Sequence, residues 1–302
     1  MSRIHEALKI AAQERSMQLA AGLEACVAEV TGEIRRPITG EPDVARPAGP
    51  PQVIADSNQG VPLRYEELVK RCAHPEWRLD PLNSVFQNSK TGQGGSERFR
   101  TLRSRLYQIA GTRRLRRLLV TSGVAGEGKT FVASNLAQSI VQQPELRVLL
   151  LDADLRASRL HMTLGAPSRP GLTDYLRGEA DEYAVIQKGM EENLCLIPGG
   201  SQASNPSELL LSERMKHLLN LLTPIFDWII IDTPPTLPVH DASVLADLVD
   251  GVLLVLRAGS TDVDVAERTV AEFRGKNLLG VVLNQVEKND SYGDRYYYTE
   301  GV

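Results

Sequence analysis

The sequence has few aromatic residues, few cysteines and no long hydrophobic segment. Aromatic side chains make up only 5% of the 302 residues while 42% are hydrophobic, so aliphatic side chains must supply most of the core. Cys26, Cys72 and Cys195 lack metal-ligand spacing, which predicts free thiols in a reducing compartment. No apolar stretch approaches the roughly 18 residues that span a bilayer, and the first residues lack a signal-peptide core. We therefore expect a cytoplasmic protein.

The chain also lacks a strong excess of charge of either sign. Its net charge is −4 and its pI is about 5.8. This balance argues against a nucleic-acid-binding protein that depends on overall positive charge, so we expect no nucleic-acid partner.

Composition divides the chain into five predicted segments. Residues 1–30 carry apolar residues at helical spacing and predict a helical extension, either packed on its own domain or docked on a partner or a second copy of the chain. Residues 31–62 are proline-rich and predict a linker, and residues 63–95 form a connecting region of open role. Residues 96–286 read as one nucleotide-binding domain. Residues 287–302 lack any apolar period and predict a disordered, tyrosine-rich tail.

The domain is organised around residues 123–130, which match the phosphate-loop pattern G-x-x-x-x-G-K-[ST]. An apolar run precedes the loop and helical spacing follows it, as the motif requires. Glycines let backbone N–H groups approach a polyphosphate, and the helix N-terminus adds its positive dipole end. Lys129 is expected to reach the β/γ-phosphates and Thr130 to ligate Mg²⁺. The predicted nucleotide-binding residues of this segment are Gly126, Glu127, Gly128, Lys129, Thr130 and Phe131.

Apolar runs alternate with helical stretches through the rest of the domain. The runs are residues 147–151, 193–197, 227–232, 251–256 and 278–283, and the expected helices are 96–110, 208–222, 241–248 and 262–273. This alternation predicts an α/β fold of the P-loop NTPase type, with helices on both faces of a parallel sheet. Ligands of such sheets lie beyond the carboxyl ends of the strands.

Three aspartates follow predicted strands and should converge on the phosphate loop. Asp232 follows three isoleucines, the arrangement of a Walker B aspartate, and is expected to hold Mg²⁺ together with Asp154 and Thr130. Asp152 lies nearer its strand and is predicted to be the base that accepts the nucleophile's proton. Lys129 and the three aspartates are thus the predicted catalytic residues.

Two further patterns are not explained by packing of a hydrophobic core. Tyr292, Tyr296, Tyr297 and Tyr298 lie in the last eleven residues, although the whole chain has only eight tyrosines. Glu97, Arg100 and Arg103 follow one another at three-residue steps of a predicted helix. Local chemistry alone favours a solvated face for this triplet.

Together these motifs resemble those of the bacterial tyrosine kinases, cytoplasmic autokinases of polysaccharide synthesis and export built on the phosphate-loop fold of the MinD/ParA ATPases. The resemblance covers residues 96–298 and rests on segments 123–130, 149–156 and 229–235 as Walker A, A′ and B motifs. Residues 171–176 match a segment common after A′. Ala125 departs from the family, in which many members have proline, and removes no ligand.

The resemblance implies what the remaining patterns do. It implies that Glu97, Arg100 and Arg103 form a contact between subunits of a ring, and that the four terminal tyrosines are autophosphorylated in a neighbour's site. It implies ATP and Mg²⁺ as cofactors, with Asn284 at an adenine contact. It also implies a separate transmembrane activator, or polysaccharide co-polymerase, that recruits the chain to the inner face of the plasma membrane, and a phosphotyrosine phosphatase as a further partner.

Two other functions stay open from the residues. One is a MinD- or ParA-like ATPase switch, in which water is the nucleophile. MinD-type proteins usually carry an extra lysine early in Walker A, where this chain has Val124 or Ala125. The other is a nucleotide-binding scaffold without useful turnover, which no motif favours.

Overall fold

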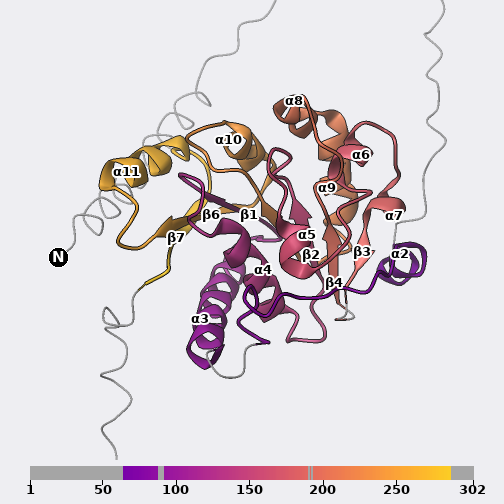
Figure 1. The fold of residues 1–302 in the computed structure, drawn as a ribbon, viewed down its shortest axis with the longest axis horizontal. Coiled ribbons are helices and arrows are strands. Elements are labelled where there is room, and N and C mark those ends of the chain that lie inside the picture. Colours follow the sequence, from indigo (N-terminus) through magenta and orange to yellow (C-terminus); the bar gives the residue numbers. More distant parts are fainter. Residues whose placement is uncertain (1–63, 88–91, 190, 192, 287–302) are drawn as a thin grey trace, which may run out of the picture. The chain divides into compact units, whose positions relative to one another are not determined.

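The computed structural model describes residues 64–87, 92–189, 191 and 193–286 (Figure 1). The predicted N-terminal extension, the linker and the tyrosine-rich tail lie outside the described residues, as does Cys26. Cys72 and Cys195 are free, as the sequence predicts, and both are buried. None of the helices in the described ranges is long and apolar enough to cross a membrane.

A seven-stranded sheet in the order β3-β4-β2-β5-β1-β6-β7 forms the centre of the described part of the chain (Figure 1). All neighbouring strands are parallel except β3, which runs antiparallel to β4. This confirms the predicted α/β fold, apart from β3, whose two residues are too few to show a periodic pattern. The strands are β1 (Arg117–Ser122), β2 (Val148–Asp152), β3 (Gln187–Lys188), β4 (Leu194–Ile197), β5 (Trp228–Asp232), β6 (Gly251–Arg257) and β7 (Leu278–Asn284).

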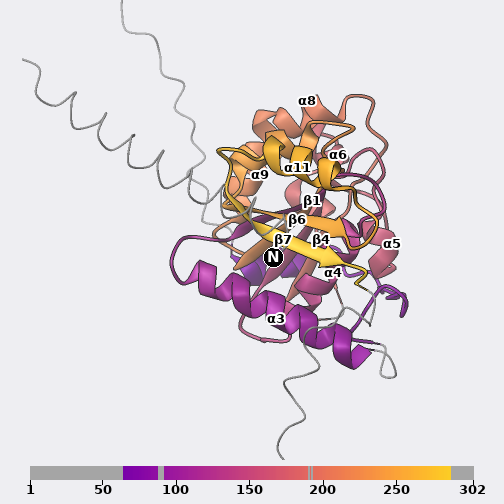
Figure 2. The same ribbon diagram turned by 90° about the vertical axis from the view of Figure 1, so that its left-hand side faces the viewer.

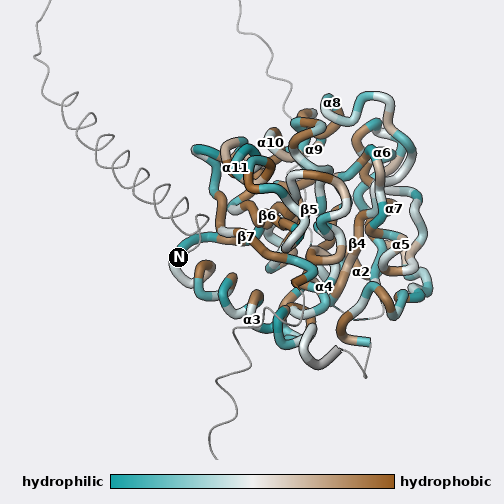
Figure 3. The backbone as a smooth tube through the Cα atoms, turned by 60° about the vertical axis from the view of Figure 1, so that its left-hand side comes forward, coloured by the Kyte–Doolittle hydropathy of each residue, from teal (hydrophilic) through white to brown (hydrophobic). Residues whose placement is uncertain are grey.

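Successive side chains of a strand point to opposite sides of the sheet, and helices cover both sides. Leu119 and Leu151 join one hydrophobic cluster, while Leu118 and Leu150 join the other. Figure 3 shows the resulting hydrophobic strands inside a more hydrophilic outer layer. One face is covered by α3 (Gly92–Ala110), α4 (Lys129–Ile140) and α5 (Leu160–Leu164). The other is covered by α2 (Tyr65–Arg71), α6 (Leu172–Leu176), α8 (Pro206–Leu211), α9 (Glu213–Leu222) and α10 (Asp241–Leu245).

Two predicted helices differ from those observed. The helix expected to start at Ser96 begins at Gly92, within a glycine-rich stretch that the sequence marks as a break. The single helix expected over residues 208–222 is two helices, because Ser212 adopts an extended conformation (φ −64°, ψ 154°) and its hydroxyl accepts the Met215 N–H. Ser212 is therefore the N-cap of α9.

The predicted helix over 241–248 is α10 followed by a 3₁₀ turn, Ala246–Leu248, and the one over 262–273 is α11 (Val263–Glu272), which packs on β6. The short helix α7 (Glu182–Val185) precedes β3. Figure 2 shows β7 at the sheet edge and α3 extending below it.

The connecting region, residues 64–87, packs against the domain. Leu68 of α2 is fully buried and Trp77 is 2% exposed. The Ser84 hydroxyl donates to Gln138 Oε1 at 2.6 Å, and the Val85 N–H donates to Asn135 Oδ1 at 2.9 Å. These bonds to α4 join the segment to the helix that follows the phosphate loop.

Candidate active site

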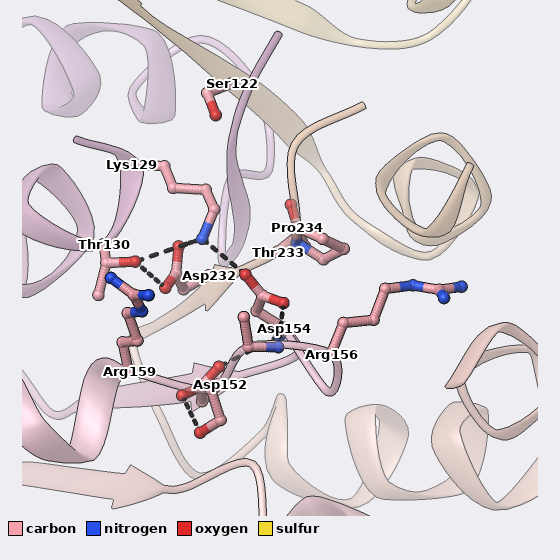
Figure 4. Close-up of polar contacts among 12 residues, drawn as sticks. Ser122, Lys129, Thr130, Asp152, Asp154, Arg156, Arg159, Asp232, Thr233 and Pro234 are labelled. Atoms are coloured by element: carbon pink, nitrogen blue, oxygen red, sulfur yellow. Dashed lines mark hydrogen bonds and ion pairs between the residues drawn. The ribbon is translucent and has the colours of Figure 1, made fainter. Parts of the chain in front are cut away.

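The strand order brings the predicted site together at the carboxyl edge of the sheet. β1 lies between β5 and β6, and β5 lies between β1 and β2. Asp152 is the register partner of Asp232, and Val120 pairs with Asp232 on the other side. The phosphate loop leaves β1 at the same edge, so Lys129 and the three aspartates meet there, as expected (Figure 4).

The loop backbone requires glycine and is anchored by the last strand. Gly126 and Gly128 have φ values of +87° and +94°, in the left-handed region that L-residues rarely adopt. A Cβ on Gly128 would lie 2.0 Å from Asn284 Nδ2. That amide donates to the Glu127 carbonyl at 2.9 Å. Asn284, predicted at an adenine contact, therefore also holds the phosphate loop to the end of β7.

The side chains of Glu127 and Phe131 contact other parts of the protein. Glu127 is 2% exposed, and its carboxylate accepts from the Val124 N–H at 2.9 Å and from the Thr261 hydroxyl at 2.5 Å. The Phe131 ring packs edge-on against Phe99 of α3, with ring centroids 5.9 Å apart. Their predicted part in nucleotide binding would therefore have to come from their backbone N–H groups.

Lys129 is held between two carboxylates. Its Nζ lies 2.9 Å from Asp154 Oδ2 and 3.6 Å from Asp232 Oδ1. The Thr130 hydroxyl donates to Asp232 Oδ2 at 2.6 Å. Burial opposes the charge on Lys129, but the carboxylates of Asp232 and Asp154 outweigh it and raise the pKa of Lys129. Burial raises the pKa of Asp232, an effect that Lys129 and Thr130 oppose.

Asp152 is fully buried, and its carboxylate accepts three hydrogen bonds from its neighbours. Its Oδ2 accepts from the Ser158 hydroxyl at 2.7 Å and the Leu160 N–H at 3.1 Å, while Oδ1 accepts from the Asp154 N–H at 3.1 Å. Burial, together with the charge of Asp232, raises the pKa of Asp152 to about 7. A carboxyl with such a pKa suits a general base at neutral pH.

Several residues near the site were not predicted. Arg156 forms a two-point ion pair with the buried Asp241, with Nε–Oδ2 at 2.8 Å, and its guanidinium also donates to the Ser207 hydroxyl at 3.0 Å. This pair joins the segment after β2 to α8 and α10. Figure 4 shows Arg159 extending from the start of α5 toward Thr130 and Asp232. The signal that could have found both is their position directly after the Asp152/Asp154 pair.

The three residues predicted at a subunit contact do not all face solvent. Glu97 and Arg100 form an ion pair and are exposed, with side chains 65% and 50% accessible. Arg103 instead turns toward α4, where its guanidinium donates to the Ser139 carbonyl. Arg103 is therefore not part of the solvated strip that spacing alone predicts, because a helix partner lies beside it.

The predicted phosphorylation sites Tyr292, Tyr296, Tyr297 and Tyr298 lie outside the described residues. The described part ends just after β7, where Gln285 has a φ of +56°. Gln285 is the one non-glycine residue with positive φ within the described ranges.

Comparison with known proteins identifies the family of this chain. The family model CbiA, the CobQ/CobB/MinD/ParA nucleotide binding domain, matches residues 118–298. The tyrosine-protein kinase YwqD of Bacillus subtilis is 35% identical over 210 residues, which are 68% of this chain and 87% of that protein. The tyrosine-protein kinase CpsD of Streptococcus agalactiae is 34% identical over 221 residues, 72% of this chain and 93% of that protein. The chain belongs to the bacterial tyrosine-kinase family.

A solved kinase domain of this family has the same fold. The kinase domain of the Escherichia coli tyrosine kinase ETK is 32% identical, covers 80% of this chain and 93% of that domain, and superposes with a TM-score of 0.65. Other matching family members are longer, and the chain spans 24% to 32% of their length. The predicted family is confirmed, and these similarities favour a tyrosine kinase over the MinD- or ParA-like switch.

Proposed function

We propose that this chain transfers the γ-phosphate of ATP to its own C-terminal tyrosines, in trans within a ring-like oligomer. The observation that carries the proposal is the cluster of Lys129, Thr130, Asp154 and Asp232 beside Asp152, at the carboxyl edge of the sheet, where ligands of open α/β sheets lie. The cluster combines a cation for the phosphates, oxygen ligands for a metal and a separate carboxylate base.

The donor set fits Mg²⁺. Thr130, Asp154 and Asp232 offer only oxygen ligands, which this cation prefers. Asp232 Oδ1 is buried and accepts no hydrogen bond from the described residues, so a cation would satisfy it. No group of three or more His, Cys, Asp or Glu in the described ranges is arranged as a metal cage. That agrees with Mg²⁺, which usually takes one or two carboxylates, water and substrate phosphates.

The residues then divide the work of phosphoryl transfer. The loop N–H groups and Lys129 hold the β- and γ-phosphates, with Lys129 exchanging its carboxylate partners for phosphate oxygens. Bound Mg²⁺ neutralises part of the phosphate charge. Asp152 accepts the phenol proton of the attacking tyrosine, and positioning of the phenol against the γ-phosphate supplies most of the rate.

Regulation follows from the charge that the reaction adds. Each phosphate adds a charge near −2 to a tail that already holds Asp290, Asp294 and Glu300. Repulsion then releases the tail and loosens the ring, in which Glu97 and Arg100 contact a neighbour and Arg103 supports the helix. A separate transmembrane activator recruits the chain to the inner face of the plasma membrane, a phosphatase resets the tail, and the cycle regulates polysaccharide synthesis and export.

The direct test maps phosphate on the full chain. We expect mass spectrometry to find phosphotyrosine among Tyr292, Tyr296, Tyr297 and Tyr298 after incubation with Mg-ATP. The matched control replaces these four residues by phenylalanine and should stay unmodified in the tail. An unmodified tail in the wild type, even with a membrane activator, would refute the kinase proposal and restore the switch as the better function.

Transfer in trans is tested by mixing two inactive partners. The four-phenylalanine chain can donate but not accept phosphate, while Lys129→Met/Asp154→Asn can accept but not donate. Phosphotyrosine on the second chain, only when both are present, supports transfer between subunits. Its absence from the mixture, with a modified wild type, would show transfer within one chain.

A further inference from the structure

Asp152 is held by one side chain that the proposed reaction does not use. A carboxylate has about four lone-pair sites. The Ser158 hydroxyl and the Leu160 N–H occupy two sites on Oδ2, and the Asp154 N–H occupies one on Oδ1. The fourth site, on Oδ1, has no hydrogen-bond partner among the described residues. In the proposed reaction this site takes the phenol proton, so the orientation of the carboxylate decides where the base acts.

We propose that Ser158 is a positioning residue for phosphoryl transfer, which fixes the Asp152 carboxylate in the orientation that leaves this one site open. The inference rests on the proposed function of Asp152 as the base. Backbone N–H donors are set by the fold, whereas a serine hydroxyl rotates to suit its partners. Ser158 therefore needs its own restraints, and the structure supplies two.

The first restraint is His161 of α5. Its Nδ1 lies 3.3 Å from Ser158 Oγ. Ser158 has a single hydroxyl proton, and it donates that proton to Asp152 Oδ2 at 2.7 Å. The contact with His161 then requires Nδ1–H as the donor to Ser158 Oγ. The hydrogen bonds run in one direction, from His161 through Ser158 to Asp152, and hold the hydroxyl in one rotation.

The second restraint is Gly199, in the loop after β4. A Cβ at Gly199 would lie 2.7 Å from both Cβ and Oγ of Ser158 and 3.8 Å from Asp152 Cγ. The loop backbone thus packs directly against Ser158 on another side. Gly199→Ala would displace Ser158 while leaving its hydroxyl in the chain, which provides a second, independent way to disturb the same contact.

Rate and nucleotide affinity separate positioning from simple stabilisation. With the full chain, Ser158→Ala should lower the maximal rate of tail phosphotyrosine formation by about tenfold, the typical effect of losing a hydrogen bond to a charged group. The half-saturating Mg-ATP concentration should stay unchanged, because the described partners of the hydroxyl lie outside the phosphate loop. Ser158→Thr keeps the hydroxyl and should restore most of the rate.

A matched control and a double variant complete the test. The control is Ser243 of α10, whose hydroxyl also bonds a carboxylate, Oε2 of Glu272 on α11, at 3.3 Å. Ser243→Ala should leave the rate unchanged. Gly199→Ala should reduce the rate in the wild type and cause a smaller further loss in Ser158→Ala, where the contact with the hydroxyl is already gone and only the contact with Cβ remains. Folding of every variant is checked by its free energy of unfolding.

Three results would overturn the inference. They are a wild-type rate in folded Ser158→Ala, a loss that Ser158→Thr does not recover, and equal rate losses from Gly199→Ala in both backgrounds. Phosphotyrosine in the wild type keeps the proposed function intact in each case. A wild type that forms none rejects the proposed function first, and the inference with it.

Discussion

Replacing Lys129 by methionine tests both the site geometry and its chemistry. Methionine is nearly as long as lysine but has no charge. In the nucleotide-free protein the change leaves Asp154 and Asp232, whose side chains are 5% and 0% exposed, without their shared cation. Two buried carboxylates close together destabilise the fold unless one of them binds a proton.

That proton sets an upper limit to the loss of stability. Protonating an aspartate of ordinary pKa, about 3.9, at pH 7 costs about 1.36 kcal/mol for each of roughly 3 pH units, or about 4 kcal/mol. At pH 5 the same step costs about 1.5 kcal/mol. The folded-state pKa is raised in the variant, so its penalty is absent below the ordinary pKa and grows as the pH rises. Burial already raises the pKa of Asp232 in the wild type.

The assay is denaturant unfolding at pH 5 and pH 7, without nucleotide or Mg²⁺. We expect Lys129→Met to lose up to about 4 kcal/mol at pH 7 and much less at pH 5. Lys129→Met/Asp154→Asn removes one carboxylate charge and should recover most of the stability at pH 7. Neither variant should phosphorylate the tail, because neither has a lysine for the phosphates. A Lys129→Met chain as stable as the wild type at both pH values would show that the ion pair does not exist in solution.

Two further predictions concern contacts around the site. Arg156→Leu leaves the buried Asp241 carboxylate without its cation, although the Ser207 hydroxyl still donates to Oδ1. It should lower the free energy of unfolding by roughly 2 kcal/mol, below the usual value for a buried pair because Arg156 is 39% exposed and one hydrogen bond remains; unchanged urea denaturation would contradict it. Gly128→Ala places a Cβ against Asn284 in a left-handed backbone and should weaken ATP binding at least about tenfold. Adding Asn284→Ala removes the clash but not the strain, so calorimetry should show partial recovery. Full affinity in Gly128→Ala alone would contradict this reasoning.

The sequence predicts the centre of the site well because strand ends place it. The phosphate loop, Asp152 and Asp232 each follow an aliphatic run, and parallel strands bring such ends to one edge. No side-chain detail was needed for that result. The parallel sheet with helices on both faces is also predictable, because buried parallel strands have continuous apolar sequences.

Features that depend on distant contacts were not predictable from local patterns. Helical spacing gives Arg103 the same status as Arg100, and only the neighbouring α4 turns Arg103 inward to Ser139. The Glu127 carboxylate accepts a hydrogen bond from the hydroxyl of Thr261, which is 134 positions away in the chain. The apolar spacing of residues 208–222 is continuous and predicts one helix, whereas Ser212 ends one helix and is the N-cap of the next.

The bond from Asn284 to the Glu127 carbonyl also has a consequence for biosynthesis. Its two ends are 157 positions apart, so Asn284 is translated long after the loop that it holds. A ribosome-bound nascent polypeptide therefore carries its Gly-Lys-Thr sequence long before the strand that secures it exists. Because domains fold as units, such an incomplete product lacks a finished nucleotide pocket, which forms only after β7 has been made.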